Sequence, residues 1–98
     1  MSDLSDLIAQ DARLIALQEL ARQIDARLNE AALARVLDVM GIRRSREWLR
    51  TQLRALEQLD AVRIEEVGGL FVAALTRQGR DHVERRAVID GVSRPGDA

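Results

Sequence analysis

The stretch from residue 41 to residue 59 constrains the fold of this chain more than any other part of it. At about 100° per residue, its leucines fall on one side of a helix and most of its arginines on the other. The leucines of this side are Leu49, Leu53 and Leu56, and the opposed arginines are Arg46, Arg50 and Arg54. Between positions 43 and 54 there are five arginines and one glutamate, a local net charge of +4 in a chain whose total is −1. The sequence therefore predicts an amphipathic helix with an apolar back and a cationic front.

Capping residues mark the ends of this helix and of the helix before it. Ser45 can accept a hydrogen bond from a free N–H of the first turn, so we expect the cationic helix to begin there. Asn29 can cap a preceding helix over 30–40, and Gly41 can end that helix by adopting left-handed backbone angles. Two helices joined by a short glycine turn predict a helix-turn-helix.

Residues 4–22 form a further predicted helix, which has two apolar sides. One side consists of Leu7, Leu14, Leu17, Leu20, Ala21 and Ile24, and the other of Leu4, Ile8 and Ile15. Such a helix is either central in its fold or shared with another subunit. For a chain of 98 residues the second alternative is slightly favoured. We therefore expect Leu4, Ile8 and Ile15 to form the interface of a homodimer.

After Asp60 the hydrophobic period changes from helical to alternating. Two strand-like runs, 62–66 and 70–75, flank the pair Gly68-Gly69, which can form the tight turn of a hairpin. The register that follows pairs Val62 with Leu75 and Ile64 with Ala73. The connector 25–28 is the place for one more short strand.

A last helix is predicted from Arg77 to about Val88, beginning after Thr76, with Val83 and Ala87 facing inward. Residues 91–98 contain glycine, proline and polar side chains, and we expect them to form a flexible tail. The sequence thus predicts one domain over residues 1–90, mainly α-helical with a small β-hairpin.

The chain lacks the residues that several kinds of chemistry require. The chain has no cysteine and one histidine, His82, which has no second ligand at metal-binding spacing, so we expect no disulfide, metal site or cofactor. It has no glycine-rich phosphate loop or catalytic-serine motif, and we expect neither catalysis nor a small-molecule substrate. All fifteen basic residues are arginine, which a GC-rich coding bias explains as well as anion binding does. No apolar run reaches the roughly 20 residues of a membrane span, and the acidic N-terminus is unlike a signal peptide, so we expect a cytoplasmic protein.

The order of predicted elements resembles the winged helix-turn-helix of the ArsR/MarR-type bacterial regulators. The features that carry this resemblance are Gly41, Leu53-x-x-Leu56-x-x-Leu59 and Leu75-Thr76-x-x-Gly79. It implies a three-helix core, a two-stranded wing and a C-terminal helix. ArsR metal sensors need cysteine or histidine ligands that this chain lacks, and the expected wing carries Glu65 and Glu66 where basic residues usually contact DNA.

The chain also resembles a family of small winged-helix proteins from Mu-like phages and prophages, over nearly its whole length. The matching segments are Asp11-Ala12-Arg13-Leu14, Arg44-Ser45-Arg46-Glu47-Trp48, Arg50-Thr51-Gln52-Leu53 and Asp81-His82-Val83-Glu84-Arg85-Arg86. This resemblance implies a phage protein in a bacterial host cell and the fold, but no particular activity.

On the DNA hypothesis, the cationic helix binds double-stranded DNA in the major groove. Arg46 and Arg50 then contact base edges or phosphate with support from Thr51 and Gln52, because a guanidinium can bind guanine through two hydrogen bonds. The DNA backbone is bound by Arg43, Arg44 and Arg54, with Ser45 at the start of the helix. The expected function is transcriptional regulation by a homodimer.

Two alternatives remain beside the DNA hypothesis. The arginines could form a solvated face, neutralised by Glu47–Arg50 and Arg54–Glu57 pairs at i,i+3 spacing. The domain could also be a non-catalytic protein-interaction module on the same scaffold, for example in phage packaging or assembly. Trp48 is expected in the core or at its edge, with stacking on a base as the alternative under the DNA hypothesis.

Overall fold

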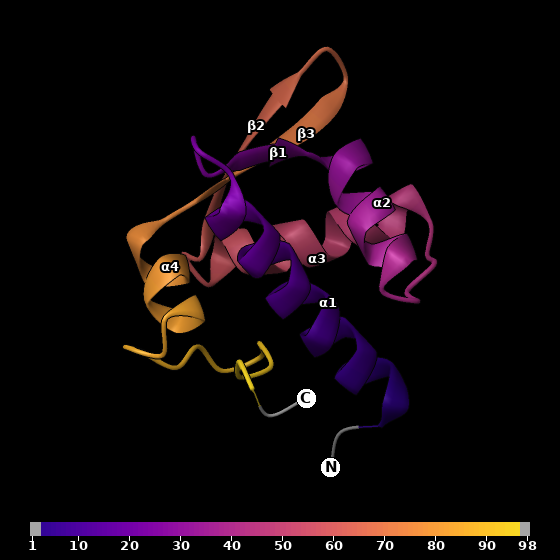
Figure 1. Ribbon diagram of the computed structural model, residues 1–98. Helices are drawn as coiled ribbons and strands as arrows, with labels where there is room; N and C mark the ends of the chain where they lie inside the picture. The colour runs from indigo at the N-terminus through magenta and orange to yellow at the C-terminus, as the bar shows by residue number, and fades with distance from the viewer. Residues whose placement is uncertain (1–2, 97–98) are drawn as a thin grey trace.

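The polypeptide folds into a small α+β domain in which four helices surround one face of a three-stranded antiparallel sheet (Figure 1). The computed structural model describes residues 3–96. In chain order the elements are α1 (Leu4–Arg22), β1 (Arg27–Asn29), α2 (Glu30–Val39), α3 (Arg46–Gln58), β2 (Val62–Val67), β3 (Leu70–Leu75) and α4 (Arg77–Val83). The predicted mainly helical fold is therefore found with a larger share of sheet than the sequence indicated. No helix within the described residues has the length and apolarity to cross a membrane.

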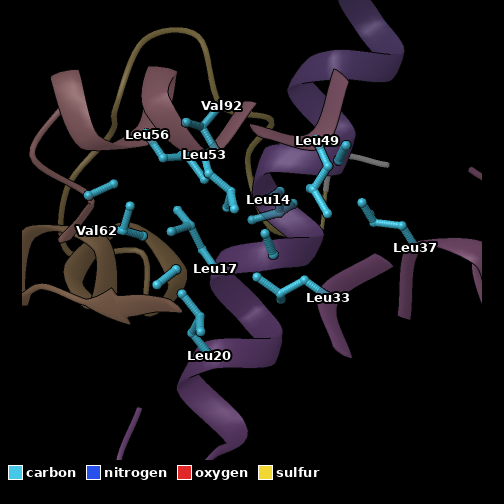
Figure 2. Close-up of a cluster of buried hydrophobic side chains, with 14 of the residues drawn as sticks. Leu14, Leu17, Leu20, Leu33, Leu37, Leu49, Leu53, Leu56, Val62 and Val92 are labelled. Carbon is cyan, nitrogen blue, oxygen red and sulfur yellow. The ribbon is translucent and has the colours of Figure 1, made fainter. Parts of the chain in front are cut away.

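The core is aliphatic and lies where α1 packs against α2, α3 and the sheet (Figure 2). The buried side chains of α1 are Ala12, Leu14, Ala16, Leu17 and Leu20. Leu7 and Ile24, which were expected on the same inward side, are exposed instead. Leu7 lies in the N-terminal half of α1, which extends past the helices that cover the rest of it (Figure 1), and Ile24 lies in the turn beyond the end of the helix.

Capping geometry confirms the starts of the two helices predicted on either side of Gly41. The Asn29 side chain accepts a hydrogen bond from Ala32 N at 2.8 Å, and the Ser45 hydroxyl accepts one from Trp48 N at 3.0 Å. Gly41 ends α2 with a φ of 88°, and the amide of Ile42 donates back to the α2 carbonyls in a Schellman motif. The two helices are thus held at a fixed angle by a turn that needs glycine.

The predicted hairpin is present with the predicted register. Val62 pairs with Leu75 and Ile64 with Ala73, and both turn glycines have positive φ. The strand order is β1-β3-β2, because the short strand β1 joins the free side of β3. The expected two-stranded wing is therefore part of a three-stranded sheet that links the start of α2 to the hairpin.

The C-terminal region departs from the prediction. Helix α4 ends at Val83 rather than near Val88, because buried His82 binds the chain as it turns back. Its Nδ1 accepts from Ile89 N at 3.0 Å, and its Nε2 lies 2.9 Å from Ser93 O. Ala87, expected inward, is consequently exposed.

The segment that follows α4 is packed against the domain. Ile89 and Val92 are buried, and Ser93 N donates to Gln10 O of α1 at 3.2 Å. Residues 91–93 of the flexible tail expected over 91–98 are therefore packed instead, because the apolar Val92 supplies a buried contact, and residues 97 and 98 lie outside the described part of the chain.

The junction between sheet and α4 explains the Leu75-Thr76-x-x-Gly79 sequence. The Thr76 hydroxyl donates to Asp60 O and accepts from Gly79 N, so it both caps α4 and binds the turn after α3. At Gly79 a Cβ atom would lie 2.2 Å from Ala61 O. Helix α4 can approach this turn only because position 79 has no side chain.

We predict that Gly79→Ala lowers the free energy of unfolding by about 1–3 kcal/mol, because backbone atoms must move to admit the methyl group. Urea titration followed by circular dichroism measures the change. The neighbouring exposed position provides the control, and Gln78→Ala should leave stability nearly unchanged. Equal stability of the two variants would contradict this account of the junction.

Candidate functional site

The outward face of α3 and the turn before it carry the arginines predicted as a binding surface. The exposed fraction of the side chain is 84% for Arg43, 61% for Arg46 and 50% for Arg54, but 28% for Arg50. Arg44 and Thr51 are also exposed. The helix therefore presents a cationic side to solvent while its leucines enter the core, as the pattern predicted.

Arg50 is the exception, because it binds a buried carboxylate. Its Nε and Nη2 atoms donate to the two oxygens of Glu30, each at 2.8 Å, and Nη2 also donates to Gly69 O at 2.8 Å. Glu30 is 2% exposed and also accepts the backbone N–H of Phe71. These hydrogen bonds join the start of α2, the middle of α3 and the hairpin.

The same contacts set the protonation state of Glu30. The side-chain hydrogen bonds from Arg50 lower the pKa of Glu30, and they outweigh burial, which acts in the opposite direction. The carboxylate in turn raises the pKa of Arg50. Glu30 is thus a permanent anion at neutral pH, and it holds the Arg50 guanidinium that was predicted to contact DNA bases.

Gln52 also differs from its predicted role. It is 5% exposed, and its Oε1 accepts from Arg13 Nε of α1 at 2.9 Å. Position 52 lies three residues after Leu49 and four before Leu56, so helical spacing alone could have placed it inward. Gln52 therefore connects α3 to α1 and is not part of the exposed surface.

The remaining arginines of the surface have weak or exposed partners. Arg43 pairs with Asp38, and Arg54 Nη1 lies 2.8 Å from Glu57 Oε1, as predicted for that i,i+3 pair. Arg46 Nε lies 4.0 Å from Glu30 Oε1. Arg44 lies over the Trp48 ring, with 5.6 Å between the guanidinium carbon and the ring centroid.

A hollow of about 390 Å³ lies between α3 and β3. The Phe71 ring forms its floor, with the guanidinium carbons of Arg50 and Arg54 at 4.2 and 4.5 Å from the ring centroid. Thr51 and Gln58 line the same hollow. The local pattern did not indicate this arrangement, because Phe71 lies in β3, distant in the chain from α3. The available signal was the chain's one phenylalanine, placed in a predicted strand.

The three residues predicted to form the dimer interface differ in their exposure. Leu4 is 71% exposed, Ile8 is partly buried, and Ile15 packs against the core of its own chain. Among residues 3–96 no cluster of three or more histidine or acidic side chains has the geometry to hold a metal ion.

The fold and the surface define a small α+β domain that displays an arginine-bearing helix beside a β-hairpin. No protein-family model matches the chain. It is 35% identical over 92 residues to the uncharacterized protein gp26 of Escherichia phage Mu, an alignment that covers 94% of this chain and 95% of that protein. The chain belongs to the gp26 family, which confirms the expected phage origin.

We predict that Glu30→Gln lowers the free energy of unfolding at pH 7 by about 1–3 kcal/mol, because it removes the charge from a buried hydrogen-bonded pair. The folded-state pKa of Glu30 lies below its ordinary value of 4.5, so its stabilisation is complete above that pH and is lost as the pH falls through the folded-state value. The difference between wild type and Glu30→Gln, measured by urea titration, should therefore shrink as the pH is lowered from about 5 through the folded-state pKa of Glu30.

The partner residue supplies the control for this prediction. Arg50→Ala leaves the buried carboxylate without its cation, so we expect it to destabilise the protein more than Glu30→Gln does. A smaller loss for Arg50→Ala would mean that the ion pair does not set the cost of burying Glu30.

Proposed function

We propose that this protein is a winged helix-turn-helix protein that binds duplex DNA through α3, as a transcriptional regulator of a phage. The order of elements α1-β1-α2-α3-β2-β3 and the sheet order β1-β3-β2 support the winged-helix assignment. In that arrangement α3 is the second helix of the helix-turn-helix, the helix that enters the major groove.

The observation that carries the proposal is the exposed cationic side of α3. Arg46 and Arg54 are at least half exposed and lie two turns apart on the same side of α3, and Thr51, further round the helix, is exposed as well. Their partners do not prevent binding, because the exposed Arg54–Glu57 pair is worth only about 0–1 kcal/mol and a phosphate can replace its carboxylate. Arg46 Nε lies 4.0 Å from Glu30 Oε1, and the Glu30 oxygens are already bonded by Arg50 and by Phe71 N–H. Counterion release from the DNA then adds to the free energy of binding.

The residues have different roles in this proposal. Arg46 and Thr51 contact base edges, and Arg54 contacts the backbone beside the hollow over Phe71. Arg43 and Arg44 contact phosphates from the turn before α3. Arg50 holds the hairpin against α3 through Gly69 and contributes orientation, not base contact.

The hairpin has a small part in this mode of binding. Glu65 lies on β2 and pairs with Arg27 at 2.9 Å, and the neighbouring Glu66 is exposed. Carboxylates at this position repel phosphate, so the proposed contact is limited to α3 and the turn before it.

We predict that Arg46→Ala and Arg54→Ala each weaken binding to a fluorescently labelled duplex by about 1–3 kcal/mol, without loss of folding. Fluorescence anisotropy between about 50 and 200 mM salt measures affinity and its salt dependence, and loss of a phosphate contact should reduce the slope by about 0.9. The control is Arg22→Ala, which removes the same charge from an exposed arginine of α1. If Arg22→Ala and Arg46→Ala weaken binding equally, α3 is not the binding surface.

A second variant tests the same surface with the opposite sign. Glu57→Gln releases Arg54 from its carboxylate, so we predict tighter duplex binding, by a few-fold, and a steeper salt dependence. Glu84→Gln is the matched control, because it removes the same carboxylate charge from the exposed Glu84–Arg86 ion pair at the end of α4. A gain with Glu84→Gln as large as with Glu57→Gln would indicate a general effect of net charge.

A protein-interaction module is the second candidate function. The observation that favours it is the apolar exposure at the end of α2, where Val39 is 85% and Met40 60% exposed. Absence of duplex binding at about 50 mM salt would favour this function over the first.

A further inference from the structure

A groove of about 470 Å³ lies between the end of α2 and the start of α3. Its apolar floor includes Leu37, Ile42 and Trp48, and its rim carries the guanidinium groups of Arg35, Arg43 and Arg44. Val39 and Met40, at the end of α2, are exposed.

The charged residues of this groove determine which kind of segment can bind in it. Asp38 is its one acidic lining residue, and it pairs with Arg43. Within residues 3–96 no carboxylate lies within 4.0 Å of Arg35 or Arg44. A groove with an apolar floor and cationic rim fits a segment that alternates aspartate with large aliphatic side chains.

The chain contains such a segment at the start of α1. Leu4 is 71% and Leu7 48% exposed, and Asp3 and Asp6 beside them are exposed as well. The first turns of α1 extend past the other helices (Figure 1), whereas further along the helix Gln10 accepts from Ser93 N and Ala12 is buried. The exposed leucines lie in these first turns.

We propose that the N-terminal half of α1 from a second copy of this chain occupies the groove. The helix cannot reach the groove of its own chain, because α1 is continuous from Leu4 to Arg22 and none of its residues lines the groove. Leu4 and Leu7 of one copy pack on Ile42 and Trp48 of the other, and Asp6 faces Arg35 and Arg44.

Charge also argues against the simplest alternative, direct pairing of α1 with α1. Such pairing through Leu4 and Ile8 brings Asp11, which lies at the edge of the same side of α1, from both copies toward one interface, and like charges repel. Ile15, expected in that interface, already packs in its own core. Docking into the cationic groove joins opposite charges instead.

The docking is reciprocal. Stable dimers bury roughly 800 Å² on each partner, more than one helix end can cover. Two-fold symmetry uses the same contact twice, since each copy supplies one helix and one groove, and it closes the assembly as a dimer. This inference does not rest on DNA binding, although Arg43 and Arg44 border both surfaces.

A charge exchange tests the interface, by sedimentation velocity without DNA. We predict a dimer for the wild type, whereas Asp6→Arg and Arg44→Glu each weaken dimerisation by at least about tenfold, because each places like charges in both contacts. An equimolar mixture of the two variants restores the dimer, because every helix then meets a groove of opposite charge. Glu84→Arg, a charge reversal at the end of α4, should leave the dimer intact.

Each alternative outcome overturns the proposal. A wild type that remains monomeric excludes the interface, and dimers of unchanged affinity in both variants place it elsewhere, as in α1–α1 pairing. A mixture that stays monomeric while both variants keep the wild-type circular dichroism spectrum excludes the opposite-charge contact. Failure of DNA binding changes none of these results, so the two proposals are tested separately.

Discussion

The Glu30 carboxylate holds together the part of the molecule that carries its exposed charge. A carboxylate that is 2% exposed is costly to bury unless its oxygens are fully bonded, and here Arg50 and the Phe71 amide bond them. The three bonded groups come from α2, α3 and β3. These bonds hold α3 and the hairpin together, and they engage the Arg50 guanidinium.

The arginines of α3 show that the role of a charged side chain depends on its position. Arg50 and Arg54 are one helical turn apart and both contact the Phe71 ring, yet one binds a buried carboxylate and the other an exposed one. The Arg50–Glu30 pair is structural, because separating its members leaves a buried charge without a partner. The other pair can exchange its partner at little cost. A count of arginines along the helix does not distinguish the two.

The sequence predicted those features of the fold that depend on neighbouring residues. The caps at Asn29 and Ser45, the glycine turn at Gly41 and the hairpin register all follow from local hydrogen bonding or from alternation. The short strand expected near residues 25–28 is also present, as β1, but its pairing with β3 was not predicted, because a three-residue strand gives almost no periodic signal.

Several of the errors at the candidate site and in the segment after α4 come from pairing between distant positions. Glu30 and Arg50 are 20 positions apart, Arg13 and Gln52 are 39 apart, and Ser93 lies 82 positions after Asp11, to which it is hydrogen-bonded. Nothing in the local pattern of either partner indicates such a contact. Arg43, Arg44, Arg46 and Arg54, by contrast, are exposed, as the sequence pattern indicated.

The surroundings of Trp48 have a spectroscopic consequence. The chain contains one tryptophan and no tyrosine, so its indole absorption and emission come from a single position. That ring lies half-buried at the junction of α2 and α3, with the Arg44 guanidinium above it. Hydration or displacement of the guanidinium changes the electric field at the indole. The emission wavelength of the unlabelled protein thus reports on the junction of α2 and α3.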